Sequence, residues 1–277
     1  MTEPDPDADR ERRDCLEQWD AAAGGWDKGG VWMRERAAAV SHWLIDAIEP
    51  EPGQQLLELA AGPGETGFLA AELIAPGGTL ICSDQSEAML EVARTRATEL
   101  GLTNVTFRVI NAESIDLPVA SVDGVLCRWG YMLMVDPLAA FVETRRVLKP
   151  GGHLSLACWA EPAANQWLAV PRAVLIEHGL AEPSPPDAPG VFALADPQRL
   201  RALLEDAGFG EIEVDAVELD FGGDSFDEWW EIMLQMSPVG AAVRAATPEL
   251  RRAVAAEVAK RLSAERTART LVALASA

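Results

Sequence analysis

The chain has 277 residues, of which 49% are apolar and 24% charged, and its formal net charge is −21. This length and composition are those of a globular protein that buries a full hydrophobic core. The acidic excess disfavours nucleic acids and anionic lipid surfaces as partners, and no uninterrupted apolar run approaches the roughly 20 residues that a membrane-spanning helix needs.

The first part of the chain is unlike the rest. Residues 1–14 are mostly charged, which predicts a disordered tail and excludes a signal peptide. Residues 16–48 are rich in Trp and Ala, with glycine pairs at 24–25 and 29–30. A helix is predicted from about Met33 to Ile48, because prolines follow at 50 and 52. This region is expected to cover a site on the following domain.

From residue 56 to residue 159, short apolar runs alternate with amphipathic segments. This alternation is typical of β-α-β units and predicts a mostly parallel sheet in a core domain spanning residues 15–159 with its preceding helices. The expected strands are 56–60, 79–83, 105–110, 122–127 and 154–159, and the expected helices are 64–74, 86–100 and 137–148.

After Trp159 the alternation stops. Residues 160–195 are rich in proline and are expected to form an irregular insertion over the substrate site. Residues 196–277 are expected to complete the core with a helix from Pro197, an edge strand at 211–221 and a last strand at 267–275. That last strand is expected to lie antiparallel between the fifth and sixth strands. A helical lid is predicted between them, at 225–264, and Ser225 with Glu228 forms a capping box at its start.

A glycine-rich loop joins the first strand to the first core helix. Gly62, Gly64 and Gly67 match the G-x-G-x-x-G fingerprint of dinucleotide-binding proteins, and Asp84 stands near the expected position of the ribose acid. However, Glu58 precedes this loop, where a carboxylate would repel a pyrophosphate. S-adenosylmethionine carries an ammonium and a sulfonium instead, so Glu58 favours that ligand.

Several motifs together resemble the class I S-adenosylmethionine-dependent methyltransferases, with the greatest similarity to the ubiquinone and menaquinone C-methyltransferase group. The resemblance extends from about Trp19 to Trp167. It implies a Rossmann-like, doubly wound, seven-stranded α/β sheet, mostly parallel with its last strand antiparallel, and helical lid insertions. The motifs are Leu57-Glu-Leu-Ala-Ala-Gly-Pro-Gly64, Ser83-Asp-Gln-Ser-Glu-Ala-Met-Leu90, Asn111-Ala-Glu113, Leu117-Pro118, Ser121-Val-Asp123 and Val147-Leu-Lys-Pro-Gly-Gly152.

The resemblance also implies residue roles in cofactor binding. The backbone of Ala60, Gly62 and Gly64 should face the methionine part, with Glu58 near its ammonium. Asp84 should accept from both ribose hydroxyls. The further residues implied in this site are Gln85 and Asn111 with the Ala112 N–H at the adenine, and Arg128 and Trp26 at the methionine end. The chain departs from the family at Ala60, usually glycine, at Gln85, usually apolar, and at Asn111, commonly an acid.

The acceptor site is predicted from the segments that can cover the carboxyl ends of the strands. Their aromatic and thioether side chains suit an apolar or aromatic small molecule, although those of the lid helix that starts after Ser225 equally suit packing of the lid onto the sheet. These side chains are Trp19, Trp167, Trp229, Trp230 and Met233. No catalytic residue is identified, and Tyr131 and His178 are the weak candidates for a general base.

The sequence therefore predicts an enzyme that transfers a methyl group from S-adenosylmethionine to O, N or C of a small molecule. The alternatives are a NAD-type oxidoreductase and a non-catalytic S-adenosylmethionine-binding protein. Four cysteines without a C-x-x-C pair and three histidines without metal-ligand spacing indicate neither a disulfide framework nor a metal site. Cytoplasmic localisation is expected, and the sequence does not indicate the oligomeric state.

Overall fold

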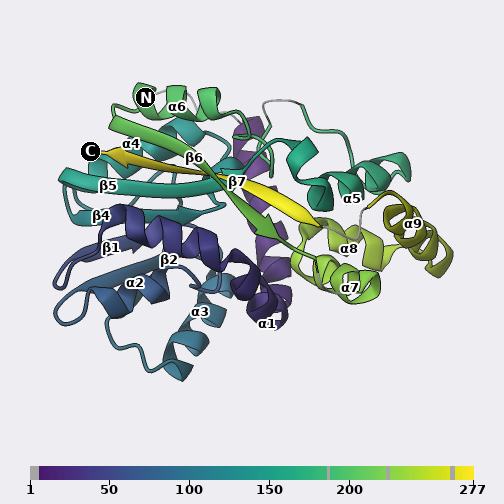
Figure 1. Cartoon of the computed structure of the whole chain (residues 1–277), viewed down its shortest axis with the longest axis horizontal. Helices are drawn as coiled ribbons and strands as arrows, with labels where there is room; N and C mark the ends of the chain where they lie inside the picture. The colour runs from purple at the N-terminus through teal and green to yellow at the C-terminus, as the bar shows by residue number, and fades with distance from the viewer. Residues whose placement is uncertain (1–5, 186–187, 223–224, 263–265) are drawn as a thin grey trace.

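Seven strands form one sheet in the order β3-β2-β1-β4-β5-β7-β6 (Figure 1). The computed structural model describes residues 6–185, 188–222, 225–262 and 266–277. The strands are β1 Gln55–Glu58, β2 Thr79–Asp84, β3 Val105–Val109, β4 Val122–Arg128, β5 Leu148–Trp159, β6 Gly210–Asp220 and β7 Thr267–Ser276. The strand order reverses between β1 and β4, which is where ligands bind in doubly wound sheets.

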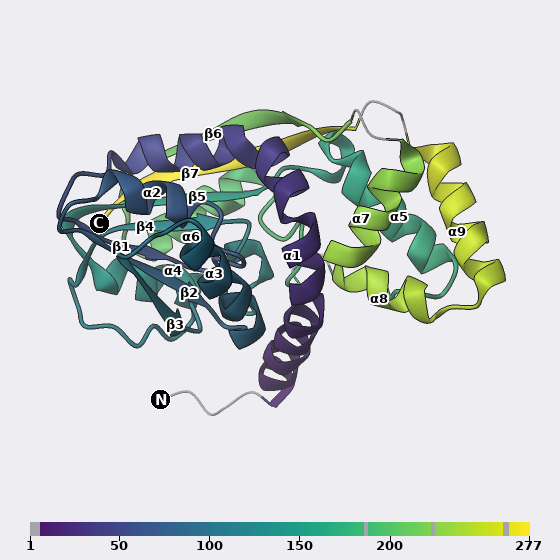
Figure 2. The ribbon, with the colours of Figure 1, turned by 90° about the horizontal axis from the view of Figure 1, so that it is seen from below.

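Helices cover both faces of the sheet, with α1, α2 and α3 on one face and α4 and α6 on the other (Figure 1). Helices α5, α7, α8 and α9 form a separate lobe beyond one end of the strands (Figure 2). The helices are α1 Pro6–Ile48, α2 Gly67–Leu73, α3 Glu87–Glu99, α4 Pro137–Val147, α5 Gln166–Glu177, α6 Pro197–Asp206, α7 Phe226–Met236, α8 Pro238–Ala245 and α9 Pro248–Arg261, with short 3-10 turns η1 Tyr131–Leu133 and η2 Pro162–Ala164.

The predicted fold is confirmed, including the place of the last strand. β7 lies antiparallel between β5 and β6, with Trp159 opposite Thr270 and Asp220 opposite Thr267. Its apolar residues are buried because other strands flank it on both sides. β6 alternates charged and apolar residues as an edge strand with one wet face does. The predicted capping box at Ser225 forms, and the side chains of Ser86 and Asp196 cap α3 and α6.

The N-terminal region differs from the prediction. The tail expected over residues 1–14 is wrong for residues 6–14, which begin α1; residues 1–5 lie outside the described part of the chain. α1 then continues through both glycine pairs to Ile48 and changes direction along its length, so its first half stands between the sheet and the helical lobe (Figure 2). The charged residues at the start of α1 show no apolar pattern that would predict a helix. This part of α1 is held by contacts with segments that are distant in the sequence, which a local pattern does not reveal.

Two further expectations are corrected. The segment 160–195 was expected to be irregular, yet it contains α5, which continues through Pro171 and packs against α9. The Lys149-Pro-Gly-Gly152 turn lies inside β5, which begins at Leu148 because Leu148 pairs with Val122. In both places, contacts with neighbouring elements stabilise a helix or strand at proline or glycine residues, which by themselves favour turns.

Candidate functional site

A cavity opens at the carboxyl ends of β1, β2, β4 and β5, at the reversal of strand order. It encloses about 1460 Å³ of empty space, part of which is open to solvent. Residues from α1, the strand ends, α5 and α7 line it, so sheet and helical lobe both contribute.

One end of the cavity is polar and centres on Asp84. The Asp84 carboxylate ends β2 and accepts the backbone N–H of Gly62 and that of Ser86, both at 2.9 Å. Burial raises the pKa of Asp84, the two N–H groups oppose that shift, and nearby Asp20 adds to it. Each carboxylate oxygen keeps a lone pair, so Asp84 can still accept hydrogen bonds from a ligand's hydroxyl groups.

Glu58 ends β1 beneath the glycine loop. Its Oε1 accepts the backbone N–H of Gly67 at 2.9 Å, whereas its buried Oε2 has no hydrogen-bond partner among the described residues. Burial raises the pKa of Glu58 to about 7, against the lowering effects of the Gly67 N–H and the Arg128 charge. Glu58 lines the cavity, and a buried carboxylate with one unpartnered oxygen is suited to a cationic ligand group.

A buried ionic network lies behind this end. Arg128 donates to Glu65 Oε2 at 2.6 Å and to the Ser41 hydroxyl at 2.9 Å. Arg34 and Arg96 approach the other Glu65 oxygen at 3.7 and 3.8 Å. Burial, and then the charge of Arg34, lower the pKa of Arg96. Three guanidinium groups thus surround one carboxylate, which leaves a local positive charge in a strongly acidic protein.

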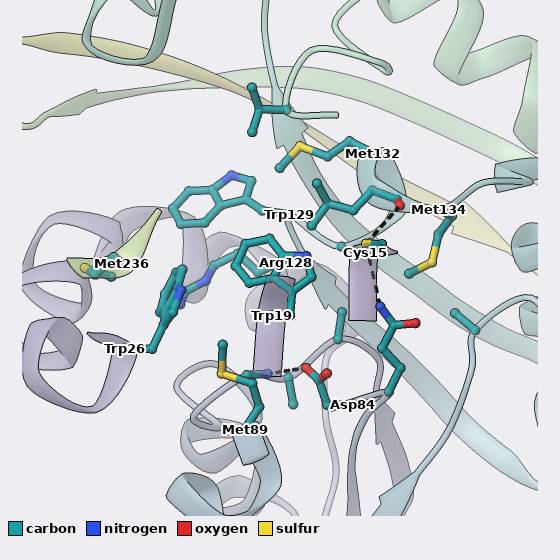
Figure 3. Close-up of a pocket in the computed structure, with 18 of the residues that line it drawn as sticks. Cys15, Trp19, Trp26, Asp84, Met89, Arg128, Trp129, Met132, Met134 and Met236 are labelled. Carbon is teal, nitrogen blue, oxygen red and sulfur yellow. Dashed lines mark hydrogen bonds between the residues drawn. The ribbon is translucent and has the colours of Figure 1, made fainter. Parts of the chain in front are cut away.

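The other end of the cavity is apolar. Trp129 stacks on Trp159 with ring centroids 4.2 Å apart, and Trp167 meets Trp159 edge to face at 5.2 Å. We call this the apolar end; its wall is Trp129, Met132, Trp159, Trp167, Leu168, Val191, Met233 and Met236. Figure 3 shows Trp129 and Met132 across the cavity from Asp84 and Met89, with Trp26 and Met236 at one side. Six of the seven methionines of the chain line the cavity, so the lining is soft and polarisable.

The first half of α1 crosses the cavity and is tied to both of its sides. Arg12 forms an ion pair with Glu113 at 2.7 Å. Cys15 accepts from the Gln85 amide at 3.8 Å and donates to the Leu133 carbonyl at 4.0 Å, as Figure 3 shows. Further along, the Ser86 hydroxyl donates to Asp20, and Ala22 and Ala23 are buried against Met89. α1 therefore covers the polar end.

Most of the residues predicted from the sequence line this cavity. They are Trp19, Trp26, Glu58, Ala60, Gly62, Asp84, Gln85, Ala112, Arg128, Trp167 and Met233. Gly64 and Asn111 are outside the lining: Gly64 lies over the Phe68 ring, and the Asn111 side chain accepts the Glu113 N–H. Trp229 and Trp230 are buried outside it as well; Trp230 stacks on Phe226 and Trp229 packs tilted against it, in keeping with lid packing.

The two candidates for a general base are not brought to the cavity. Tyr131 is fully buried, its hydroxyl lies 2.6 Å from the Thr144 hydroxyl, and its ring stacks on Phe141. Burial raises the pKa of Tyr131 well above its ordinary value. His178 ends α5 and is outside the residues that line the cavity.

Two groups of lining residues were not predicted from the sequence. Arg12 and Cys15 were assigned to or beside a tail, because only tertiary contact makes their segment helical. The second group follows β4 and consists of Met132, Leu133, Met134 and Val135. An apolar run directly after a strand indicates residues at the carboxyl end of the sheet, where the cavity lies. Glu65 was missed for a different reason: nothing in the sequence shows that it faces Arg128.

Comparisons with known proteins agree with this geometry. Residues 50–181 match the model of a family described as a methyltransferase domain. Nocamycin O-methyltransferase of Saccharothrix syringae is 29% identical over 89% of this chain and 90% of its own length. A ubiquinone/menaquinone biosynthesis C-methyltransferase of Acidiphilium cryptum is 33% identical over 56% of this chain and 66% of its own length.

The solved structures resemble this chain in fold. The YcgJ protein of Bacillus subtilis superposes with a TM-score of 0.57, at 18% identity, over 85% of this chain and 97% of its own. A [4+2]-cyclase superposes with a TM-score of 0.55, at 19% identity, over 87% of this chain and 80% of its own. Since this fold carries more than one reaction, the chemistry has to be argued from the residues of the cavity.

Proposed function

Because the chain belongs to the class I S-adenosylmethionine-dependent methyltransferases, we propose that it methylates a small, largely apolar or aromatic molecule. The observation that carries this proposal is the division of one cavity into a polar end around Asp84 and an apolar end of Trp and Met side chains. The cofactor supplies an electrophilic methyl group on a sulfonium. The residues of the chain bind it, exclude water and align the acceptor.

The residues present fit this cofactor. We assign the two ribose hydroxyls to Asp84, whose carboxylate is held in place by the N–H groups of Gly62 and Ser86. We assign the methionine ammonium to Glu58, because its buried Oε2 lacks a partner among the described residues and a cation would satisfy it. Ala60 and Gly62 both adopt left-handed backbone conformations, with φ of 49° and 52°, and space is open where a Gly62 side chain would stand.

The remaining cofactor contacts are proposed on proximity to these anchors. Gln85 and Ala112 line the cavity beside Asp84 and are placed at the adenine, with Glu113 and Cys15 added to that wall. Arg128 and Trp26 are placed at the methionine end. Gly64 and Asn111 do not line the cavity, so we assign them no direct contact with the cofactor and propose that they shape the loops that bind it.

The acceptor is proposed to lie in the apolar end, against Trp167 and Met233, with Trp19 closing the side nearer α1. Two relatives carry names that specify an O-methyltransferase and a quinone C-methyltransferase. An acceptor with an apolar ring system agrees with both names and with the lining. We further propose that the chain is divided into an N-terminal lid with core at 15–159, an insertion over the substrate site at 160–195, and a C-terminal part at 196–277 that carries the helical lid 225–264.

Cellular context remains part of the proposal. No described helix is long and apolar enough to cross a membrane. We place the enzyme in the cytoplasm because its four cysteines are all free thiols, as expected in a reducing compartment. A nucleic-acid substrate is disfavoured by the net charge of −21.

A binding experiment with a matched competitor tests the function. Calorimetry should detect S-adenosylhomocysteine binding and no NADH binding, which separates a methyltransferase from a NAD-type oxidoreductase. Incubation with S-adenosylmethionine and a panel of aromatic acids, phenols and amines should then give a methylated product, detected by mass spectrometry. Binding of NADH in place of S-adenosylhomocysteine would refute the proposal, and cofactor binding without any product would favour a non-catalytic binding protein.

A further inference from the structure

Every ionisable group on the cavity wall lies toward the polar end or already has a partner. Asp84 accepts two backbone N–H groups, and Glu58 accepts one. Glu113 accepts the Val135 N–H at 2.8 Å and pairs with Arg12 at 2.7 Å. Cys15 is a thiol whose pKa burial raises. The carboxylates of the wall therefore bind loop N–H groups, α1 or the cofactor, and none of them is left to accept a proton from the acceptor.

The apolar end offers no proton acceptor within the described residues. Its wall is made of indole, thioether and aliphatic side chains. No phenol or imidazole of the described residues lines it: Tyr131 bonds Thr144 outside the cavity, and His42, His153 and His178 are not among the lining residues. A neutral alcohol or phenol bound here would have to lose its proton with no group placed to take it.

An acceptor that is already an anion avoids this difficulty. An anionic oxygen is attracted to the sulfonium of the cofactor, and that attraction is strong where water is excluded. Arg128 lines the cavity, and together with Arg34 and Arg96 it gathers around the single carboxylate of Glu65, so these groups add positive charge behind the polar end. At pH 7 a carboxylic acid, with a pKa near 4, is fully ionised. A phenol, with a pKa near 10, is ionised to only about one part in a thousand.

We propose that the acceptor oxygen enters the apolar end already ionised, so that the substrates are carboxylic acids, or enols of similar acidity, borne on an apolar ring system. This inference rests on the proposed methyl-transfer function. The carboxylate oxygen donates a lone pair to the methyl carbon, the carbon–sulfur bond breaks, and its electron pair goes to sulfur. The products are a methyl ester and a neutral sulfide, and no proton is transferred.

The test compares three acceptors of one shape: 2-naphthoic acid, 2-naphthol and 2-naphthylamine, each at saturating S-adenosylmethionine so that cofactor binding does not enter. We expect kcat/KM for the acid to be flat from pH 6 to 9 and at least about 100-fold above that for naphthol at pH 7. Any naphthol methylation should rise about tenfold per pH unit, following the pKa of naphthol itself. An acidic enol of the same size distinguishes enols from carboxylic acids.

Two further measurements make the test decisive. Tryptophan fluorescence should show naphthoate binding to the S-adenosylhomocysteine complex at least tenfold tighter than naphthol at pH 7, which decides the question even if none of the three turns over. His178→Ala and Tyr131→Phe, the latter checked for folding by its Tm, should leave both pH profiles unchanged.

Preferred methylation or binding of the neutral compounds would overturn the inference while leaving the methyltransferase function intact. The inference would also be overturned if kcat/KM for naphthol did not depend on pH, or if His178→Ala or Tyr131→Phe abolished naphthol methylation. Failure of S-adenosylhomocysteine to bind would instead refute the proposed function itself.

Discussion

The backbone of Gly25 in α1 lies against the carbonyl group of Gln235 in α7, so closely that a Cβ on Gly25 would overlap that carbonyl oxygen. One turn later, a Cβ on Gly29 would overlap the side chain of Met236. The glycines that interrupt the sequence pattern therefore serve the close packing of α7 on α1. Since α7 carries Met233 and Met236, this contact also sets one wall of the cavity.

Gly25→Ala should destabilise the protein by about 1–3 kcal/mol, because the new methyl group forces two backbones apart. Gly24→Ala is the matched control: nothing lies within 4 Å of its Cβ position, and alanine in a helix interior is favoured over glycine by roughly 0.5–1 kcal/mol. Thermal unfolding should lower the Tm of the first variant and raise or preserve that of the second. Equal Tm values for the two variants would show that α7 does not pack here.

Asp84→Ala should weaken S-adenosylhomocysteine binding by about 1.5–3 kcal/mol for each charged hydrogen bond lost. The fold should remain, although the Gly62 N–H loses its acceptor. Asp116→Ala removes a carboxylate that is 97% exposed and lies outside the cavity, and it should bind like the wild type. Calorimetry on both variants measures the difference, and unchanged affinity of Asp84→Ala would remove this residue from the site.

Cofactor affinity should depend on pH through Glu58, whose pKa is raised to about 7 by burial. Since the ammonium needs the ionised carboxylate, affinity for S-adenosylhomocysteine should increase from pH 6 to 7.5, by up to about tenfold per pH unit below the pKa. Binding near pH 7 should release protons, which calorimetry in buffers of different ionisation enthalpy detects. A flat pH dependence would contradict the assignment.

Glu58→Gln checks the same assignment through stability. The raised pKa means that the folded protein binds more protons than the unfolded chain between about pH 4.5 and 7, so this group lowers stability as pH rises through that window. The neutral variant should therefore be more stable than the wild type above pH 7, by up to about 3 kcal/mol, while binding the cofactor less tightly. Chemical denaturation measures the free energy of unfolding of both proteins at pH 5 and pH 8. A difference between them that does not increase from pH 5 to pH 8 would contradict the raised pKa of Glu58.

Residues 16–32 of α1 should become more protected when S-adenosylhomocysteine binds. This part of α1 covers the polar end, where the Ser86 hydroxyl donates to Asp20, and where Trp19 and Asp84 both line the cavity (Figure 3). A cofactor bound against this half of the helix should therefore hold it in place. Hydrogen exchange with and without the ligand measures the change. High protection in the free protein that the ligand leaves unaltered would mean that the segment is a fixed part of the core.

The sequence by itself determined the sheet, its order of helices and strands, and the position of Glu58, Gly62 and Asp84 at one edge of that sheet. Periodicity, N-caps and glycine turns act over a few residues, so Ser86 and Asp196 cap their helices as their local sequence predicts. Asp84 and Gly62 were predicted together from their spacing and from the family resemblance, and they meet because both stand at the carboxyl ends of adjacent parallel strands.

Only the tertiary structure decided what covers the cavity. α1 begins at Pro6 although its first residues are highly charged, because Arg12, Cys15 and Asp20 find partners on distant loops. The same holds for Glu65, which is buried against Arg128 from another strand end, and for Tyr131, which follows β4 yet turns into the core toward Thr144. These placements depend on which side chains meet across the fold, and local sequence preferences carry no information on that.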